Sequence, residues 1–186
     1  MPKVHLSKDN LRREIVGYLK AMKTLKIPVL PTEPFALFKE LKRGTVSGGP
    51  YDGCSIFEVA NRVMSDLVVF AAAEQLLHEP PSDVSPAPLT EITVLLGTAD
   101  GWDLSAHLAD GRELLGECFN VAPSFFATKF RNSVKALEEV SHAVRLVAFN
   151  GEAILSLEKL TKRRKPWLNL LPIDVASRLT AWQSWM

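Results

Sequence analysis

Two carboxylates, Asp103 and Glu117, lie in segments that otherwise have the pattern of buried strands. Glu117 interrupts the run LLGECFNV, in which most neighbours are apolar. A buried carboxylate without a partner is costly in free energy, so such a group is either neutralised or paired. Glu117 therefore either projects from the edge of a sheet or meets a positive charge there.

The two carboxylates are expected to come close together. WDLSAHL alternates between apolar and polar residues, as a half-buried strand does, and ADGR is typical of a hairpin turn before ELLGECFNV. Asp103 lies 14 positions before Glu117 (103 to 117), so the hairpin brings them roughly opposite each other. Two close carboxylates repel, and a shared proton or a divalent cation relieves the repulsion.

The period of two also predicts which side chains share a face of each strand. In the first strand the polar face holds Asp103, Ser105 and His107. The apolar face of that strand holds Trp102, Leu104, Ala106 and Leu108. In the second strand one face holds Leu115, Glu117, Phe119 and Val121.

Other interpretations of the two carboxylates stay open at this point. Asp103 begins its strand directly after the turn GTADG, and it could accept a hydrogen bond from that turn. Glu117 could belong to an edge strand and pair with a lysine or arginine. Neither arrangement would require a metal.

The elements around the hairpin indicate a mixed α/β (α+β) domain. Helical spacing predicts helices over residues 8–26, 34–43, 55–77, 124–142 and 174–186. Strands are predicted at 91–97 and 143–149 besides the two of the hairpin, whereas PWLNLLPI in the tail has only the composition of an apolar patch. This order predicts a central sheet flanked by helices.

The order helix, strand, strand with Asp103, hairpin, strand with Glu117, helix, strand resembles the PD-(D/E)XK nuclease superfamily, which has the restriction-endonuclease-like fold. The resemblance covers roughly residues 55–150. It implies a central mixed sheet flanked by helices over residues 51–186. Residues 1–50 would then form an additional N-terminal helical extension packed on this core.

The resemblance also implies roles for particular residues. Asp103 and Glu117 would hold one or two Mg²⁺ ions, and Glu58 on the preceding helix would assist as a metal ligand. Members of the family carry a lysine two positions after the glutamate, but this chain has Phe119 there. In some members the lysine has moved to the following helix, where Lys129 is the candidate here.

A helical wheel at about 100° per residue supports Lys129 as the displaced catalytic lysine. Its helix has an apolar stripe of Phe126, Phe130, Val134 and Leu137. Lys129 lies at the border of this stripe, whereas Arg131 and Lys135 point the other way. Lys129 can therefore extend along the apolar surface toward Glu117.

These residues predict a divergent metal-dependent nuclease that hydrolyses phosphodiester bonds of DNA. Carboxylate ligands suit Mg²⁺ or Mn²⁺ better than zinc. The basic run of Lys162, Arg163, Arg164 and Lys165 would contact nucleic acid, or it is a solvated charge run. The cofactor would be Mg²⁺ or Mn²⁺, and the partner DNA.

An alternative function is also consistent with the sequence: a catalytically inactive restriction-endonuclease-like domain that acts as a dimeric interaction or nucleic-acid-binding module. In a homodimer of this kind the aromatic C-terminus, with Trp182 and Trp185, would form the contact surface. The two functions predict different environments for Asp103 and Glu117. A nuclease needs both within reach of one cation, whereas an interaction module lets them diverge or neutralises them.

Composition excludes several other classes. The 186 residues are 47% hydrophobic with a net charge of +1, which indicates one ordinary globular domain. Cys54 and Cys118 lie far apart, so neither a zinc site nor a disulfide framework is expected. No apolar run is long enough to cross a membrane, and we expect a cytoplasmic protein without membrane contact. No Walker A, GxGxxG, GxSxG or HExxH motif is present.

Overall fold

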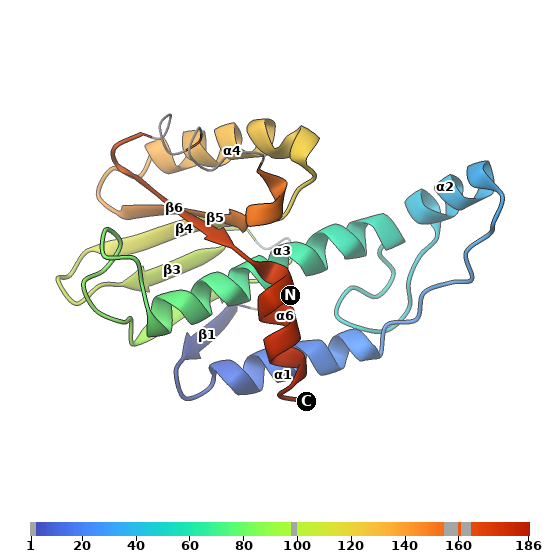
Figure 1. The fold of residues 1–186 in the computed structure, drawn as a ribbon, viewed down its shortest axis with the longest axis horizontal. Coiled ribbons are helices and arrows are strands. Elements are labelled where there is room, and N and C mark those ends of the chain that lie inside the picture. The colour runs from blue at the N-terminus through green and yellow to red at the C-terminus, as the bar shows by residue number, and fades with distance from the viewer. Residues whose placement is uncertain (1–2, 98–99, 155–159, 161–164) are drawn as a thin grey trace.

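The computed structural model describes residues 3–97, 100–154, 160 and 165–186 and confirms a mixed α/β fold. Five α-helices and a six-stranded mixed sheet lie in this part of the chain (Figure 1). The strands are β1 (Lys3–Ser7), β2 (Glu91–Leu95), β3 (Leu104–His107), β4 (Glu113–Phe119), β5 (Val144–Asn150) and β6 (Leu168–Ile173). The helices are α1 (Leu11–Lys23), α2 (Pro34–Arg43), α3 (Ile56–His78), α4 (Pro123–Glu138) and α6 (Val175–Gln183), with a short 3-10 turn at Gly151–Ala153.

The sheet follows the order β1-β2-β3-β4-β5-β6. Strands β1 to β4 are antiparallel, while β4, β5 and β6 are parallel. The predicted hairpin joins β3 to β4, and its Gly111 has a φ of 85°, a conformation that favours glycine. Helix α4 connects β4 to β5, and this crossover allows the two strands to run parallel.

Strands β1 and β6 were not predicted from the sequence. β1 lies in the N-terminal segment, where only helices were expected, and its Leu6 pairs with Ile92. β6 forms from the apolar tail segment and pairs with β5. Both strands are short, and both depend on partners distant in sequence, so local patterns do not specify them. Part of the expected N-terminal helical extension, residues 3–7, thus belongs to the sheet itself.

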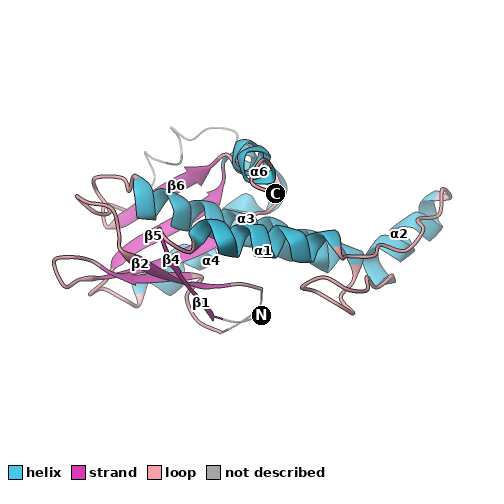
Figure 2. Cartoon of the chain, turned by 90° about the horizontal axis from the view of Figure 1, so that it is seen from below, coloured by secondary structure: helices cyan, strands magenta, loops and turns pink. Residues whose placement is uncertain are grey.

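Helix α3 supplies the main layer on one face of the sheet. It begins with a capping box between Ser55 and Glu58. Its second half is almost entirely buried because the sheet packs on one side and α1 and α6 on the other (Figures 1 and 2). Ala71, Ala72 and Ala73 are fully buried, and their small side chains allow the close packing of these layers.

Helix α4 covers the opposite face, where its main contacts with the sheet are to β4 and β5. Phe126 and Leu137 of α4 are buried with Phe119, Val147 and Phe149 of the two strands. Trp102 also packs in this cluster, although the alternation predicted that it would share the face of Leu104. The strand begins only at Leu104, so its alternation does not extend back to Trp102.

Residues 24–55, here called the arm, extend away from the rest of the molecule (Figures 1 and 2). The arm contains α2 and is anchored to α3 by a small cluster of Val46, Tyr51 and Val59. Helix α2 itself has no buried residue. In the part of the chain that the structure describes, no helix has the length and apolarity needed to span a membrane.

Candidate functional site

The sheet places Asp103 opposite Glu117, as the sequence predicts. Leu104 pairs with Gly116 across β3 and β4, so the next residue outward on each strand is Asp103 on one and Glu117 on the other. The Oδ2 atom of Asp103 accepts a hydrogen bond of 2.7 Å from the backbone N–H of Cys118. This bond fixes the Asp103 carboxylate against β4.

Glu117 meets a positive charge from α4. The Nζ atom of Lys129 lies 3.4 Å from Oε2 of Glu117, and the Ser133 hydroxyl donates to the same oxygen at 3.2 Å. The side chain of Glu117 is 16% exposed and that of Lys129 is 40% exposed. The contact forms because the apolar stripe of α4 packs on the sheet and leaves Lys129 and Ser133 at its border. Glu117 is therefore paired with a cation, the second of the two arrangements that its position in a buried strand allows.

Phe119 occupies the position where the family resemblance places a lysine, and it is part of the core. It is buried and contacts the rings of Phe126 and Phe149 at centroid distances of 5.7 and 6.1 Å. Its face also lies beneath Lys129, whose Nζ is 5.6 Å from the ring centre. The cation therefore reaches this region from the helix above the strand rather than from the strand itself.

Asp103 has a perturbed proton affinity. Burial raises its pKa to about 6, and the nearby carboxylates of Glu117 and Asp66 add to the increase. The hydrogen bond from Cys118 and the charge of Lys129 oppose this increase. Burial also raises the pKa of the Cys118 thiol, so that side chain is an unreactive part of the core. The segment directly before β3 thus contains a carboxyl group whose pKa is raised toward the neutral range.

A third carboxylate, Asp66 of α3, lies near these residues and was not among the predicted site residues. It is buried and accepts hydrogen bonds from the hydroxyls of Tyr18 and Tyr51 and, at 2.9 Å, from the backbone N–H of Gly97. Burial raises the pKa of Asp66. A sequence signal was present, because Asp66 directly precedes the apolar run LVVFAAA. The three hydrogen bonds join α1, the arm, α3 and the loop that follows β2.

Glu58 does not join Asp103 and Glu117. Its carboxylate accepts from the Ser55 backbone and hydroxyl in the capping box, and these bonds lower its pKa. It lies eight residues before Asp66, about 12 Å along the helix axis. Among the described residues, no three or more His, Cys, Asp or Glu side chains gather closely enough to hold a metal ion. The predicted assistance of Glu58 as a metal ligand therefore has no geometric support.

The pair of Asp103 and Glu117 is nevertheless compatible with Mg²⁺ or Mn²⁺. Mg²⁺ retains several waters and binds through one or two carboxylates together with substrate phosphates. The two residues lie opposite each other in the register of adjacent strands, and repulsion from the Glu117 carboxylate contributes to the raised pKa of Asp103. A divalent cation would relieve this repulsion.

The predicted basic contact patch lies mostly outside the described residues, which exclude Lys162, Arg163 and Arg164. Lys165 is described, and its Nζ lies 3.7 Å from Oε1 of Glu138 at the end of α4. This lysine is exposed and pairs with an acidic neighbour. The structure thus places one of the four predicted residues, and it places that residue in an ion pair.

The aromatic C-terminus is not a free contact surface. Trp182 is fully buried, and its Nε1 donates to Glu74 at 3.2 Å. Trp185 packs against the same core and lies beneath the guanidinium of Arg12 at 5.4 Å. Both rings therefore hold α6 against α1 and α3, so a homodimer would need another surface.

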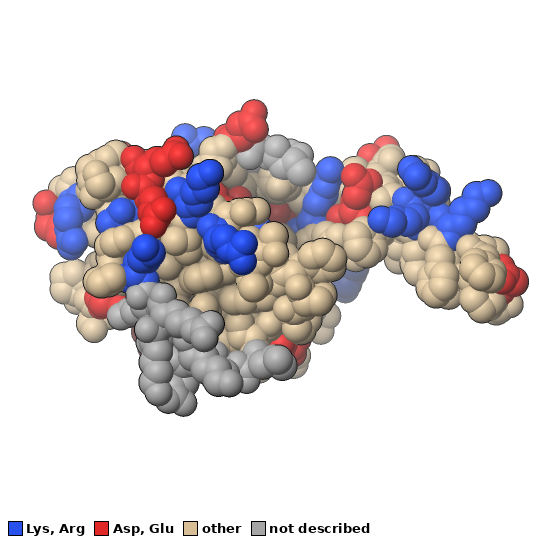
Figure 3. Space-filling model, turned by 90° about the horizontal axis from the view of Figure 1, so that it is seen from above, with Lys and Arg blue, Asp and Glu red and all other residues tan. Residues whose placement is uncertain are grey.

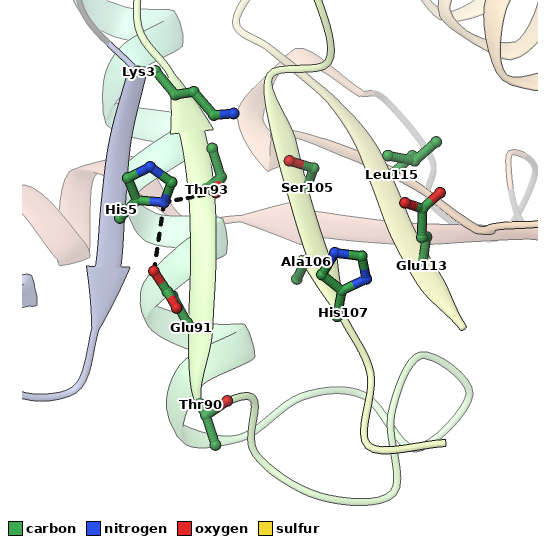
Figure 4. A pocket seen from close by; sticks show the side chains of 10 residues that line it. All are labelled: Lys3, His5, Thr90, Glu91, Thr93, Ser105, Ala106, His107, Glu113 and Leu115. Carbon is green, nitrogen blue, oxygen red and sulfur yellow. Dashed lines mark hydrogen bonds and ion pairs between the residues drawn. The ribbon is translucent and has the colours of Figure 1, made fainter. Parts of the chain in front are cut away.

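A hollow of about 440 Å³ lies on the open part of the sheet, which α4 leaves uncovered (Figure 4). Polar side chains of β1 to β4 line it, including His5, Thr93, Ser105 and His107. His5 contacts Thr93 and Glu91, while Leu115 at the edge of the hollow is two residues before Glu117 on the same strand. The hollow thus extends along the face of the sheet that carries Glu117.

Comparison of the chain with models of known protein families finds no match, and neither do comparisons with curated proteins and with solved structures.

Proposed function

We propose that this protein is a divergent restriction-endonuclease-like domain that hydrolyses phosphodiester bonds with a bound divalent metal. The fold assignment rests on the order of elements around the site. Helix α3 precedes an antiparallel β2-β3-β4 unit, and α4 then leads to β5 parallel to β4. This is the order on which the sequence resemblance to the PD-(D/E)XK superfamily was based.

The observation that carries the proposed function is the contact between Lys129 and Glu117, opposite Asp103. A hydrolytic site for phosphodiesters needs carboxylates that hold a metal and a cation close to the scissile phosphate. Lys129 supplies a cation 3.4 Å from Glu117, although Phe119 replaces the lysine of the strand. The proposal thus rests on charged groups from three segments: Asp103 directly before β3, Glu117 on β4 and Lys129 on α4.

The residues of the chain have distinct roles in this proposal. Asp103 and Glu117 would bind Mg²⁺ or Mn²⁺, which supplies polarisation of the phosphate and an acidified water. Lys129 is positioned to contact a phosphate oxygen or the attacking water beside Glu117. Ser133 holds the Glu117 carboxylate in place through its hydroxyl. Asp103 must lose its proton to act as a ligand, so a metal would compete with protonation there and should bind more weakly as the pH falls.

Isothermal titration calorimetry with Mn²⁺ tests the proposal directly. We expect binding by the wild type and its loss in both Asp103→Ala and Glu117→Ala. Asp110→Ala, in the exposed hairpin turn, is the matched control and should bind like the wild type. Cleavage assays on DNA and RNA then compare the wild type with Lys129→Met. Binding that persists without either carboxylate would contradict the proposal.

A catalytically inactive binding module is the second candidate, and one observation favours it. Asp103 already accepts from Cys118, and Glu117 is already paired with Lys129 and Ser133, all within the protein itself. If millimolar Mn²⁺ gives no heat of binding, these contacts are structural and the binding-module function takes precedence.

A further inference from the structure

The arm has an exposed face that combines aromatic and basic side chains. On α2, the outward residues are Phe35, Phe38, Lys39, Lys42 and Arg43, here called the arm face. Phe35 is 82% exposed and Phe38 is 62% exposed. Leu37 and Leu41 lie on the other side of the helix and are less exposed. The helix therefore directs both of its aromatic rings outward, toward solvent.

The arm face carries a local cluster of positive charge. The arm as a whole contains four lysines or arginines and three acidic residues, a net charge of +1, but three of the four cations, Lys39, Lys42 and Arg43, lie together on the arm face. The four basic side chains of the arm are exposed, and within the described residues none of them forms a salt bridge. Lys42 instead lies over the ring of Phe57, 5.3 Å from its centre. The arm face thus presents three positive charges that no described salt bridge neutralises.

Figure 3 shows Lys and Arg side chains on the arm, among some acidic ones, on the side of the molecule that also carries α4. The candidate site with Lys129 lies beneath α4 on this side. Helix α3 connects the two regions. It begins at the arm, and its residue Asp66 lies close to Asp103. A long polyanion bound at the arm face could therefore extend toward the candidate site.

We propose that the arm face binds single-stranded nucleic acid. Lysine and arginine contacts to phosphates provide the sequence-independent attraction, and exposed aromatic rings stack on unpaired bases. Phe35 and Phe38 are spaced i, i+3 on one face of α2, with Lys39, Lys42 and Arg43 beside them. Protein interfaces are depleted in lysine, so this composition favours nucleic acid over a second copy of the chain. This inference rests on the proposed function, because it names the partner on which the proposed nuclease would act.

Fluorescence anisotropy with a labelled oligothymidine of about 20 nucleotides tests the inference, since the length exceeds typical single-strand site sizes. EDTA is present, so that cleavage cannot interfere. The variant Lys39→Glu/Lys42→Glu/Arg43→Glu should lose at least about tenfold in affinity, and the salt slope of binding should fall by about 2. Phe35→Ala/Phe38→Ala should lose about tenfold or more.

The control variant Lys3→Glu/Lys8→Glu/Arg13→Glu makes the same charge change at exposed positions away from the arm. We expect it to retain most of the wild-type affinity. Equal losses in the arm and control variants would overturn the assignment, since the effect would then be one of net charge. No binding by the wild type, or unchanged binding by both arm variants, would also overturn it.

Further measurements separate this inference from its alternatives and from the proposed function. Equal affinity for a duplex of the same length, with no effect of Phe35→Ala/Phe38→Ala, would contradict stacking on unpaired bases. A dimer by analytical ultracentrifugation that the arm variants dissociate, without single-strand binding, would assign the arm to self-association. Binding is measured in EDTA, without the metal, so failure of the proposed catalysis leaves the binding result intact.

Discussion

The Nζ atom of Lys129 lies 5.6 Å from the ring centre of Phe119 and 3.4 Å from the carboxylate of Glu117. Phe119, at the position where the resemblance places a lysine, thus packs against Lys129 of α4. A phenyl ring attracts a cation over its face. Phe119 therefore has two roles, since it packs in the core and lies under the charge that pairs with Glu117.

Placing a lysine at position 119 should destabilise the protein. Phe119→Lys removes a buried ring that contacts Phe126 and Phe149 and places an ammonium group in an apolar cluster. We expect a loss of about 3 kcal/mol or more in the free energy of unfolding. Urea denaturation measures this change, with Phe125→Lys, an exposed position on α4, as the control. A stable Phe119→Lys variant would contradict the packing role.

Replacement of Lys129 should affect activity far more than stability. The ion pair with Glu117 is partly exposed, so Lys129→Met should change the free energy of unfolding by about 1 kcal/mol or less. If Lys129 contacts the reacting phosphate, the cleavage rate should fall about 100-fold or more. Lys135→Met, on the exposed side of the same helix, should cleave at the wild-type rate. Similar rates for both variants would remove Lys129 from the site.

The raised pKa of Asp103 predicts a specific pH dependence of stability. The folded protein binds a proton at Asp103 more tightly than the unfolded chain does, so this group destabilises the fold progressively as pH rises from about 4 to about 6. Above that range the cost is complete, on the order of 1–3 kcal/mol. Asp103→Asn should therefore be more stable than the wild type at pH 8.

The comparison is made by urea unfolding at pH 4 and at pH 8. The advantage of Asp103→Asn should largely vanish at pH 4, where the wild-type carboxyl is protonated in the folded state. An advantage of the same size at both pH values would show that the proton affinity of Asp103 is not its cause. Bound Mn²⁺ should reduce the advantage at pH 8, because it stabilises only the ionised wild-type carboxylate.

The buried Asp66 should be important for the attachment of the arm. Asp66→Ala leaves the hydroxyls of Tyr18 and Tyr51 without their acceptor and should cost about 3 kcal/mol or more in the free energy of unfolding. Tyr51→Phe removes one hydroxyl only and should cost about 1–2 kcal/mol. Urea denaturation and limited proteolysis within residues 24–55 report the two effects. Equal costs for the two variants would contradict the central position of Asp66.

Local sequence determined the central elements of the fold and part of the site. The alternation in residues 102–108, the turn at Asp110 and Gly111, and the following strand predicted the hairpin that places Asp103 opposite Glu117. The apolar stripe of α4 predicted that Lys129 would lie toward Glu117. These predictions succeeded because hairpin register and helix periodicity are short-range properties of the chain.

Only the tertiary structure decided the rest. β1 and β6 are strands because the sheet offers each of them a distant partner. Asp66 is buried because Tyr18, Tyr51 and Gly97, from three other segments, converge on it. Glu58 was expected at the metal site, but it lies in the first turn of α3, where it forms the capping box with Ser55. Burial, and with it the raised pKa of Asp103, depends on how distant segments pack together, which no local pattern specifies.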